Sequence, residues 1–201
     1  MKKIIWSFVS IVGLLLTSCD SNPTLPTATG AAGEVLLVIN EDVFKSEVGD
    51  SIIQILNHDV PCLPQSEPMF NISRTNFEGF TSIIKPARNI IMIDAGRAYS
   101  KVKMKTEENK WSKPQAILTI QGPTTQEVAD AIGKYKKQIA DFFELAERNR
   151  SIKHHLRYNE EDMSQKVQEH LGISFAVPRN MVRCKKAENF MWISNNAGNM
   201  N

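Results

Sequence analysis

The sequence predicts an α+β domain in which two or three helices pack against a mostly antiparallel sheet, as in a ferredoxin-like sandwich. Two runs of apolar β-forming residues, Glu34–Ile39 and Asn89–Asp94, are too short for helices and are typical of buried strands. Lys101–Thr106 alternates lysines with other residues, and Gln115–Gln121 follows at hairpin distance. A helical period begins after Pro123. The order of strand, helix, strands, helices and strands is neither strictly alternating nor all-β.

The first helix is predicted over residues 43–57. Asn40 is suited to cap it, and the acidic residues that follow favour the positive end of the helix dipole. Val48, Ile52 and Ile55 then fall on one stripe. Gly49 is expected to weaken this helix by up to about 1 kcal/mol. A proline-rich loop over residues 58–68 follows.

The longest predicted helix begins at Thr124, which forms a capping box with Glu127. Its apolar residues recur at spacings of four and three, which predicts one buried stripe over about six turns and a length of about 35 Å. The stripe consists of Val128, Ile132, Tyr135, Ile139, Phe142 and Ala146.

The C-terminal part is predicted to contain another helix and two short strands. The helix begins near Asn159 and is stopped by Gly172, and the strands cover Ile173–Val177 and Phe190–Ile193. Cys184 also falls in a predicted strand. The residues after Ile193 show no periodicity, so we expect an exposed apolar patch or an unpaired edge at Phe190–Ile193.

The N-terminus has the layout of a bacterial lipoprotein signal. Lys2 and Lys3 precede a mostly apolar run, Ile4–Leu16, and Cys19 follows two small residues. The run of 13 residues is too short to span a bilayer, which needs about 20. We therefore expect a signal peptide over 1–18, lipid attachment at Cys19, a flexible tether over 19–33 and the α+β domain over 34–201. The alternative is an ordinary secretory signal.

Charge argues against nucleic-acid binding. Removal of the signal takes away Lys2 and Lys3, which leaves 22 basic and 22 acidic residues. A nucleic-acid-binding protein usually carries a clear basic excess. The charges are unevenly placed, because residues 34–79 are mainly acidic and residues 134–157 mainly basic.

The sequence lacks the patterns of metal, nucleophile or phosphate chemistry. It contains no HExxH, CxxC, GxSxG, GxGxxG or P-loop motif, so we expect no metal, no cofactor and no catalytic residue of these kinds. Neighbouring His154 and His155 diverge on a helix and do not easily share one ion. Two cysteines, Cys62 and Cys184, do not make a disulfide framework, and we expect both to be unpaired.

Two carboxylates are the remaining candidates for catalysis. Asp94 ends a predicted buried strand, and Glu67 lies in the proline-rich loop. A glycosidase-type pair needs carboxyl groups about 5–10 Å apart. The competing interpretation is that Asp94 caps a turn and Glu67 is solvated. Lys101, Lys103 and Lys105 are interpreted as charges that protect an edge strand, with an anionic surface as the alternative partner.

Four segments together carry a family resemblance. They are Gly33–Ile39, Leu63–Phe70 with its Leu-Pro-Gln-x-Glu-Pro-Met-Phe string, Arg88–Ile91 and Phe190–Ile193. From residue 30 onward the chain resembles an uncharacterised family of Bacteroidetes envelope lipoproteins, domain of unknown function 4837. That resemblance implies localisation but no activity, and it implies that the domain over 34–201 is truncated at its C-terminus.

These observations predict an envelope lipoprotein without catalysis of its own that serves as a binding or assembly module. Its partners would be the membrane, through the lipid anchor at Cys19, and an envelope protein or polymer, with no nucleic acid. The alternative function is a hydrolase of envelope polymers that uses Glu67 and Asp94. We expect an outer rather than an inner membrane, although Asp20 after the lipidated cysteine specifies inner-membrane retention in some bacteria.

Overall fold

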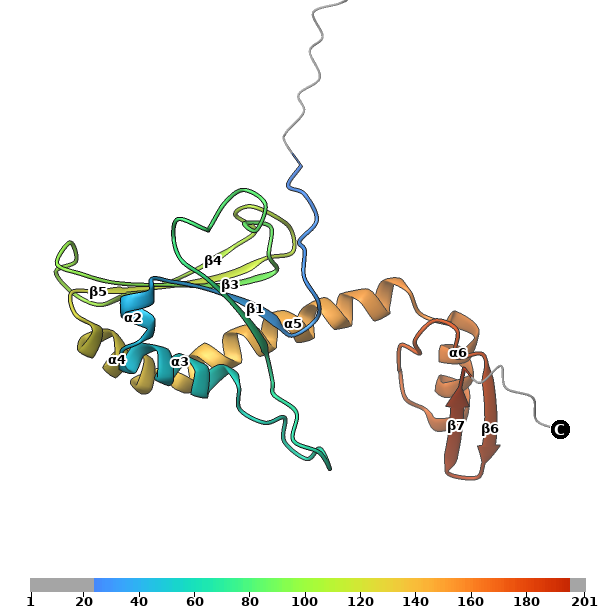
Figure 1. Ribbon diagram of the computed structural model, residues 1–201. Helices are drawn as coiled ribbons and strands as arrows, with labels where there is room; N and C mark the ends of the chain where they lie inside the picture. Colours follow the sequence, from blue (N-terminus) through green and yellow to red (C-terminus); the bar gives the residue numbers. More distant parts are fainter. Residues whose placement is uncertain (1–23, 196–201) are drawn as a thin grey trace, which may run out of the picture.

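A mixed five-stranded sheet organises the larger part of the molecule. The computed structural model describes residues 24–195, and Figure 1 shows the sheet with helices beneath it. The strand order is β2-β1-β3-β5-β4, and β1 pairs in parallel with both β2 and β3, as does β3 with β5. Only β4 runs antiparallel, in a hairpin with β5. The strands are β1 Glu34–Ile39, β2 Asn71–Thr75, β3 Asn89–Ala95, β4 Lys103–Glu108 and β5 Ala116–Gly122.

The α+β class is confirmed, whereas the predicted mostly antiparallel sheet is wrong. Strands β1, β3 and β5 are largely buried on both faces, which is why β1 and β3 read as nearly continuous apolar runs. Such runs are typical of parallel strands covered on both sides, whereas half-solvated antiparallel strands alternate. The sequence did not predict β2, because this short edge strand is largely exposed and polar, with the sequence Asn-Ile-Ser-Arg-Thr.

The first predicted helix is divided into α2, Glu41–Phe44, and α3, Glu47–Leu56. Ser46 begins the second helix, because its hydroxyl accepts a hydrogen bond from the Val48 amide at 3.3 Å. The corner between the two helices is tight. A Cβ atom at Gly49 would lie 1.9 Å from the Phe44 carbonyl oxygen, so glycine is required there for space.

The longest predicted helix is also divided, into α4, Thr125–Lys134, and α5, Lys136–Arg157. The predicted cap is confirmed, since the Thr124 hydroxyl accepts from the Glu127 amide at 3.2 Å. The break at Tyr135 alters which side chains face the sheet. Phe143 is fully buried, whereas Phe142, which we placed on the buried stripe, is only half-buried.

Two hydrophobic layers cover the two faces of the sheet. Helices α2 to α5 pack on one face, around a core that includes Leu37, Ile52, Ile120 and Phe143. The other face carries Leu36, Val38, Ile90 and Ile117 and has no helix over it. Instead, the coil over residues 76–88 covers it with Phe77, Phe80 and Ile84, and Trp111 joins them from the β4–β5 turn.

Part of the predicted tether lies against the domain. Thr27 forms a bridge with Lys113, and Thr29 forms one with Ala87. The Gly33 carbonyl accepts from the Asn71 amide at 2.8 Å. Residues 27–33, which we predicted as flexible, are therefore held in place by backbone hydrogen bonds.

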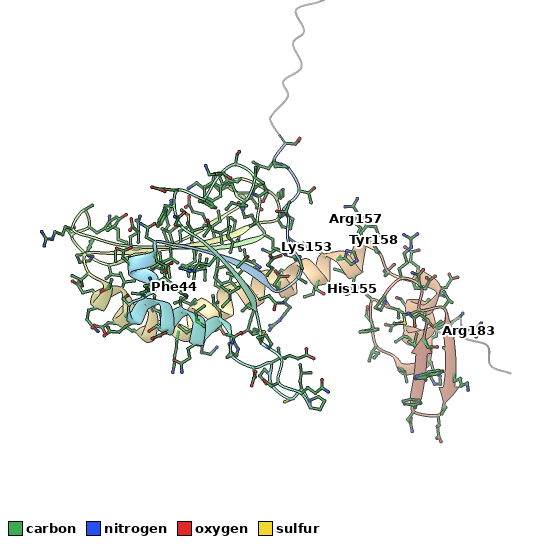
Figure 2. The ribbon with its side chains drawn as sticks, in the orientation of Figure 1. Phe44, Lys153, His155, Arg157, Tyr158 and Arg183 are labelled. Atoms are coloured by element: carbon green, nitrogen blue, oxygen red, sulfur yellow. The ribbon has the colours of Figure 1, made fainter. Side chains whose placement is uncertain are left out.

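A small second unit with its own core follows α5. It consists of α6, Glu161–Leu171, and a hairpin of β6, Arg183–Ala187, with β7, Phe190–Ser194. Figure 1 shows this unit at the far end of α5, and Figure 2 labels Lys153, His155 and Arg157 where the helix approaches it. Its core contains Met163, Val167 and Val177.

The predictions for this unit are partly confirmed. Gly172 stops α6 in the left-handed conformation, with φ of 71°, as predicted. Residues 173–177 form no strand, because Val177 is instead tied to α6 by the Ser164 hydroxyl at 3.0 Å. Strand β7 leaves Phe190 and Trp192 exposed at 61% and 44%, so the predicted apolar patch is present among the described residues.

Candidate functional site

A groove between the edge of the sheet and the α4–α5 junction is the strongest candidate for a ligand site. We call it the α4–α5 groove. Its cavity volume is about 670 Å³, within the 300–1,000 Å³ typical of small-molecule sites. Its apolar lining consists of Val102, Met104, Leu118, Ala131, Tyr135, Ile139 and Phe142, and its polar lining consists of Thr106, Asp130, Lys134 and Gln138.

The groove exists because two elements diverge. Strand β4 is an edge strand that pairs only with β5, with Met104 opposite Ile120 and Thr106 opposite Leu118. The helix direction changes at Tyr135, where φ and ψ of −106° and 20° interrupt the regular helix. Ile139 is buried at the bottom, while Phe142 remains half-exposed at the side.

The margin of this groove carries three polar groups of different charge. Asp130, Lys134 and Gln138 are all exposed and come from consecutive turns around the break, so they supply one anionic, one cationic and one neutral hydrogen-bonding group. The Lys134 ammonium lies 5.2 Å from the Tyr135 ring centroid. An amphipathic ligand would place its apolar part against Leu118 and its polar end beside these groups.

A buried ionic cluster holds α5 to the amino end of β3. The Glu147 carboxylate contacts the guanidinium groups of Arg88 at 2.8 Å and Arg150 at 2.7 Å. It also accepts a hydrogen bond from the side-chain amide of Asn89 at 2.7 Å. Asn89 also accepts from Arg150 at 2.9 Å and donates to the Glu34 carbonyl at 2.9 Å. We call these residues the Glu147 cluster. Apart from Arg88 Nε, its members pair with one another and with backbone carbonyls, which indicates that the cluster holds α5 in place.

The electrostatics of the Glu147 cluster support this interpretation. Two guanidinium groups face one carboxylate, and burial lowers the pKa of Arg150 below its ordinary value while Glu147 opposes that change. Arg88 Nε is the one buried side-chain nitrogen or oxygen without a hydrogen-bond partner among the described residues. Clefts of about 200 and 370 Å³ flank Arg88. Ser151 and His154 both line the larger one, but no hydrogen bond joins these two side chains.

The two candidate carboxylates lie at opposite ends of the parallel strands. Glu67 is exposed in the loop that enters β2 at the amino ends of the parallel strands. Asp94 lies at the carboxyl end of β3, opposite Gln121. A rise of about 3.3 Å per residue separates the ends of β3 by roughly 20 Å, too far for a glycosidase pair. The structure therefore does not assemble the carboxylate pair of the hydrolase hypothesis.

Asp94 instead belongs to a local hydrogen-bond network. Its carboxylate accepts from the Tyr99 hydroxyl at 2.6 Å, and the Gln121 side chain donates to the same hydroxyl at 3.0 Å. The hydrogen bond to Asp94 and, secondarily, burial raise the pKa of Tyr99 above its ordinary value. This arrangement closes the turn after β3, which agrees with the competing interpretation of Asp94.

The other singled-out residues are scattered. Cys19 lies outside the described residues. Lys103 and Lys105 are exposed on edge strand β4, where charge discourages strand addition, and Lys101 precedes it. Cys62 and Cys184 are free thiols, one in the loop before β2 and one in β6. No group of three potential ligands in residues 24–195 is arranged to hold a metal ion.

Sequence reasoning identified several side chains of the groove but not the groove itself. It placed Met104, Leu118 and Ile139 on inward faces, because each follows the period of its own element. It could not show that the inward side chains of β4 are separated by open space from those of α4 and α5. The Glu147 cluster has a weak sequence signal, an acidic and a basic residue three positions apart on a helix, and its partners are about 60 residues away.

The comparisons with known proteins identify a family but no activity. A family model described as Domain of unknown function (DUF8532) matches residues 28–155. No curated protein and no solved structure matches the chain. Within the described residues, no helix combines the length and apolar character needed to cross a membrane.

This match corrects the predicted resemblance to domain of unknown function 4837, which is wrong. The matched region covers the sheet and most of α5 and stops before the small C-terminal unit. The misleading strings include Glu34–Ile39 and Asn89–Ile91, which are strands buried on both faces. Such apolar runs occur in many parallel sheets and therefore discriminate poorly between families.

Proposed function

The chain belongs to the family Domain of unknown function (DUF8532), and we propose that it is a lipid-anchored binding protein of the bacterial cell envelope. In this proposal the polypeptide performs no catalysis. The α4–α5 groove receives the ligand, and the lipid on Cys19 retains the domain at a membrane. The observation that carries the binding role is the open apolar groove with its polar margin.

The shape and lining of the groove define the chemical class of ligand. Its walls are mainly aliphatic and aromatic, so most of the affinity would come from burial of apolar surface, at about 25 cal/mol per Å². Lys134 and Gln138 at the margin can donate hydrogen bonds to a polar end that is anionic or accepts hydrogen bonds, whereas Asp130 would repel an anionic end placed beside it. A fatty acid or another small amphiphile with one anionic end fits this description.

The anchor rests on the signal that ends at Cys19. A single acyl chain holds a protein only marginally, whereas the several chains of a bacterial lipoprotein give stable attachment. Replacement of Cys19 by alanine is expected to abolish incorporation of labelled fatty acid and to release the protein from membranes. Sedimentation of the Cys19→Ala variant with membranes after a high-salt wash would contradict the anchor.

Ligand binding can be tested with a fluorescent fatty acid whose emission increases in an apolar environment. We expect saturable binding to the mature protein. In the Ala131→Trp variant an indole would occupy the groove beside Leu118, and binding should fall at least ten-fold. Lys136→Trp is the matched control, because Lys136 is exposed at the start of α5 and does not line the groove.

The outcome depends on the comparison of these two variants. Both should retain the circular dichroism and thermal unfolding of the parent protein, so that a loss of binding reports the groove. Lack of saturable binding by the parent protein, or an equal loss in both variants, would rule out the groove as the site for this class of ligand.

A further inference from the structure

We propose that the surface beside the N-terminal segment lies directly on an anionic phospholipid bilayer. We call this surface the exit face, and we define it by Ile83, Lys85, Lys110, Trp111 and Lys113. It belongs to the coil over residues 76–88 and the β4–β5 turn, on the side of the sheet that carries no helix. This inference rests on the proposed lipid anchor and adds an orientation to it.

The chain path brings the exit face close to the lipid. The Lys113 amide donates to the Pro26 carbonyl at 2.8 Å, and the Thr29 amide donates to the Pro86 carbonyl at 2.9 Å. Residues 26–29 therefore lie against this face. Cys19 and Thr27 are eight residue steps apart, so the chain between them can span no more than about 28 Å. A tether this short keeps the exit face near the headgroups.

Side-chain contacts join the two segments of the exit face, the coil over residues 76–88 and the β4–β5 turn. The ammonium groups of Lys85 and Lys110 lie 6.0 and 4.8 Å from the Trp111 ring centroid. The Ser112 hydroxyl donates to the Pro86 carbonyl at 2.9 Å and so ties the β4–β5 turn to the coil. Tryptophan beside lysines is a combination found where proteins meet the membrane interface.

Ile83 is the most exposed large apolar side chain among the described residues, at 83%. A single exposed apolar residue needs no explanation on its own. Ile83 differs because it is two positions from Lys85 and three from Pro86, whose carbonyl accepts from the Thr29 amide. Apolar insertion combined with basic residues is the usual requirement for binding to an anionic bilayer.

The charge of the exit face is one-sided. Residues 80–88 and 109–114 contain four basic residues and no acid. Arg88 is turned inward to Glu147, which leaves three lysines at the surface. Two acids oppose them, because Glu107 contacts Lys110 at 3.4 Å and the coil over residues 76–88 also carries exposed Glu78. The net positive charge fits phosphatidylglycerol and related anionic lipids and does not favour a neutral bilayer.

The orientation has a consequence for the rest of the molecule. Figure 1 shows α2, α3, α4 and the loop before β2 on the opposite side of the sheet from the coil over residues 76–88. If the exit face lies on the bilayer, the α4–α5 groove does not face the lipid, because Leu118, Ile139 and Phe142 of its lining belong to the core on the other face of the sheet.

The experiment uses the acylated mature protein in vesicles and an environment-sensitive fluorophore. One sample carries the fluorophore on Ile83→Cys, with Cys62 and Cys184 replaced by serine. The control sample carries it on the native Cys62, which is exposed in the loop on the other side of the sheet. Vesicles of phosphatidylcholine alone are compared with vesicles that also contain phosphatidylglycerol.

We expect the fluorophore at residue 83 to shift to shorter wavelength in the anionic vesicles and the fluorophore at Cys62 to remain in water. Replacement of Lys85, Lys110 and Lys113 by glutamine should lower the ratio of inserted to aqueous fluorophore by roughly five-fold for each lysine. An aqueous spectrum at residue 83, an equal shift on neutral vesicles or an equal shift at Cys62 would each overturn the proposal.

The same samples separate this inference from the proposed function. Flotation of the protein with vesicles reports the lipid anchor regardless of orientation. A protein that floats but keeps residue 83 in water refutes the orientation alone. A protein that does not float refutes the anchor.

Discussion

Phe143 is expected to be a principal support of the larger core, and its neighbour Phe142 is not. Phe143 is 0% exposed, and its ring meets Phe70 at 6.3 Å and Phe142 at 4.9 Å, both in edge-to-face geometry. Replacement of a buried phenylalanine by alanine typically lowers the free energy of unfolding by about 3–5 kcal/mol. The two aromatic pairs place Phe143→Ala in the upper part of that range.

Phe142→Ala should cost about 1–2 kcal/mol, because this half-buried side chain lines the open groove and its removal leaves no closed cavity. Leu145 is the control on the same helix. Its side chain is 53% exposed, and Leu145→Ala should change the free energy of unfolding by no more than about 0.5 kcal/mol.

Urea unfolding followed by tryptophan fluorescence measures these differences. Trp192 belongs to the small C-terminal unit, so a Trp192→Phe background makes Trp111 the reporter of the larger one. A cost for Phe142→Ala equal to that for Phe143→Ala would refute the assignment of the buried face of α5. A large cost for Leu145→Ala would show that a partner or another part of the molecule covers that helix face.

Three other predictions follow from named contacts. Glu147→Gln should lower the free energy of unfolding by about 2–4 kcal/mol, because it leaves two partly buried arginines uncompensated, and a loss below 1 kcal/mol in urea unfolding would contradict this. The hydrogen bond to Asp94 raises the pKa of Tyr99 above 10.0. The stabilisation that this hydrogen bond gives the folded protein is complete below pH 10 and declines as the pH rises through the raised pKa. The stability advantage of the parent protein over the Tyr99→Phe variant should therefore shrink above pH 10. Gly49→Ala should lower the melting temperature, whereas Gly133→Ala, which has open space, should leave it unchanged or raise it.

Most individual elements could be predicted because their signals are local. The apolar runs of β1 and β3, the alternation in β4 and the capping box at Thr124 each depend on a few neighbouring residues. The failures have non-local causes. Strand β2 has little apolar content and is identified only by its pairing with β1. The division of the first helix follows from the close approach of Gly49 to the Phe44 carbonyl.

The candidate groove shows a similar division between local and non-local information. The period of each element predicted that Met104 and Ile139 face inward. The space between them depends on the turn of the chain at Tyr135 and on the position of β4 at the sheet edge. The separation of Glu67 from Asp94 depends likewise on the parallel pairing of β1 with β2 and β3. This pairing puts the amino ends of the strands, near Glu67, on one side and their carboxyl ends, near Asp94, on the other.

The sequence by itself determined the α+β class, the buried strands and the cap of α4, because each is specified by residues adjacent along the chain. The tertiary structure decided the strand order, the direction of pairing, the groove and the exit face. Those features depend on hydrogen bonds and packing between residues far apart in the sequence, such as Thr29 with Pro86 and Arg88 with Glu147. A periodic pattern specifies which face of an element is buried, but it carries no information about which element covers that face.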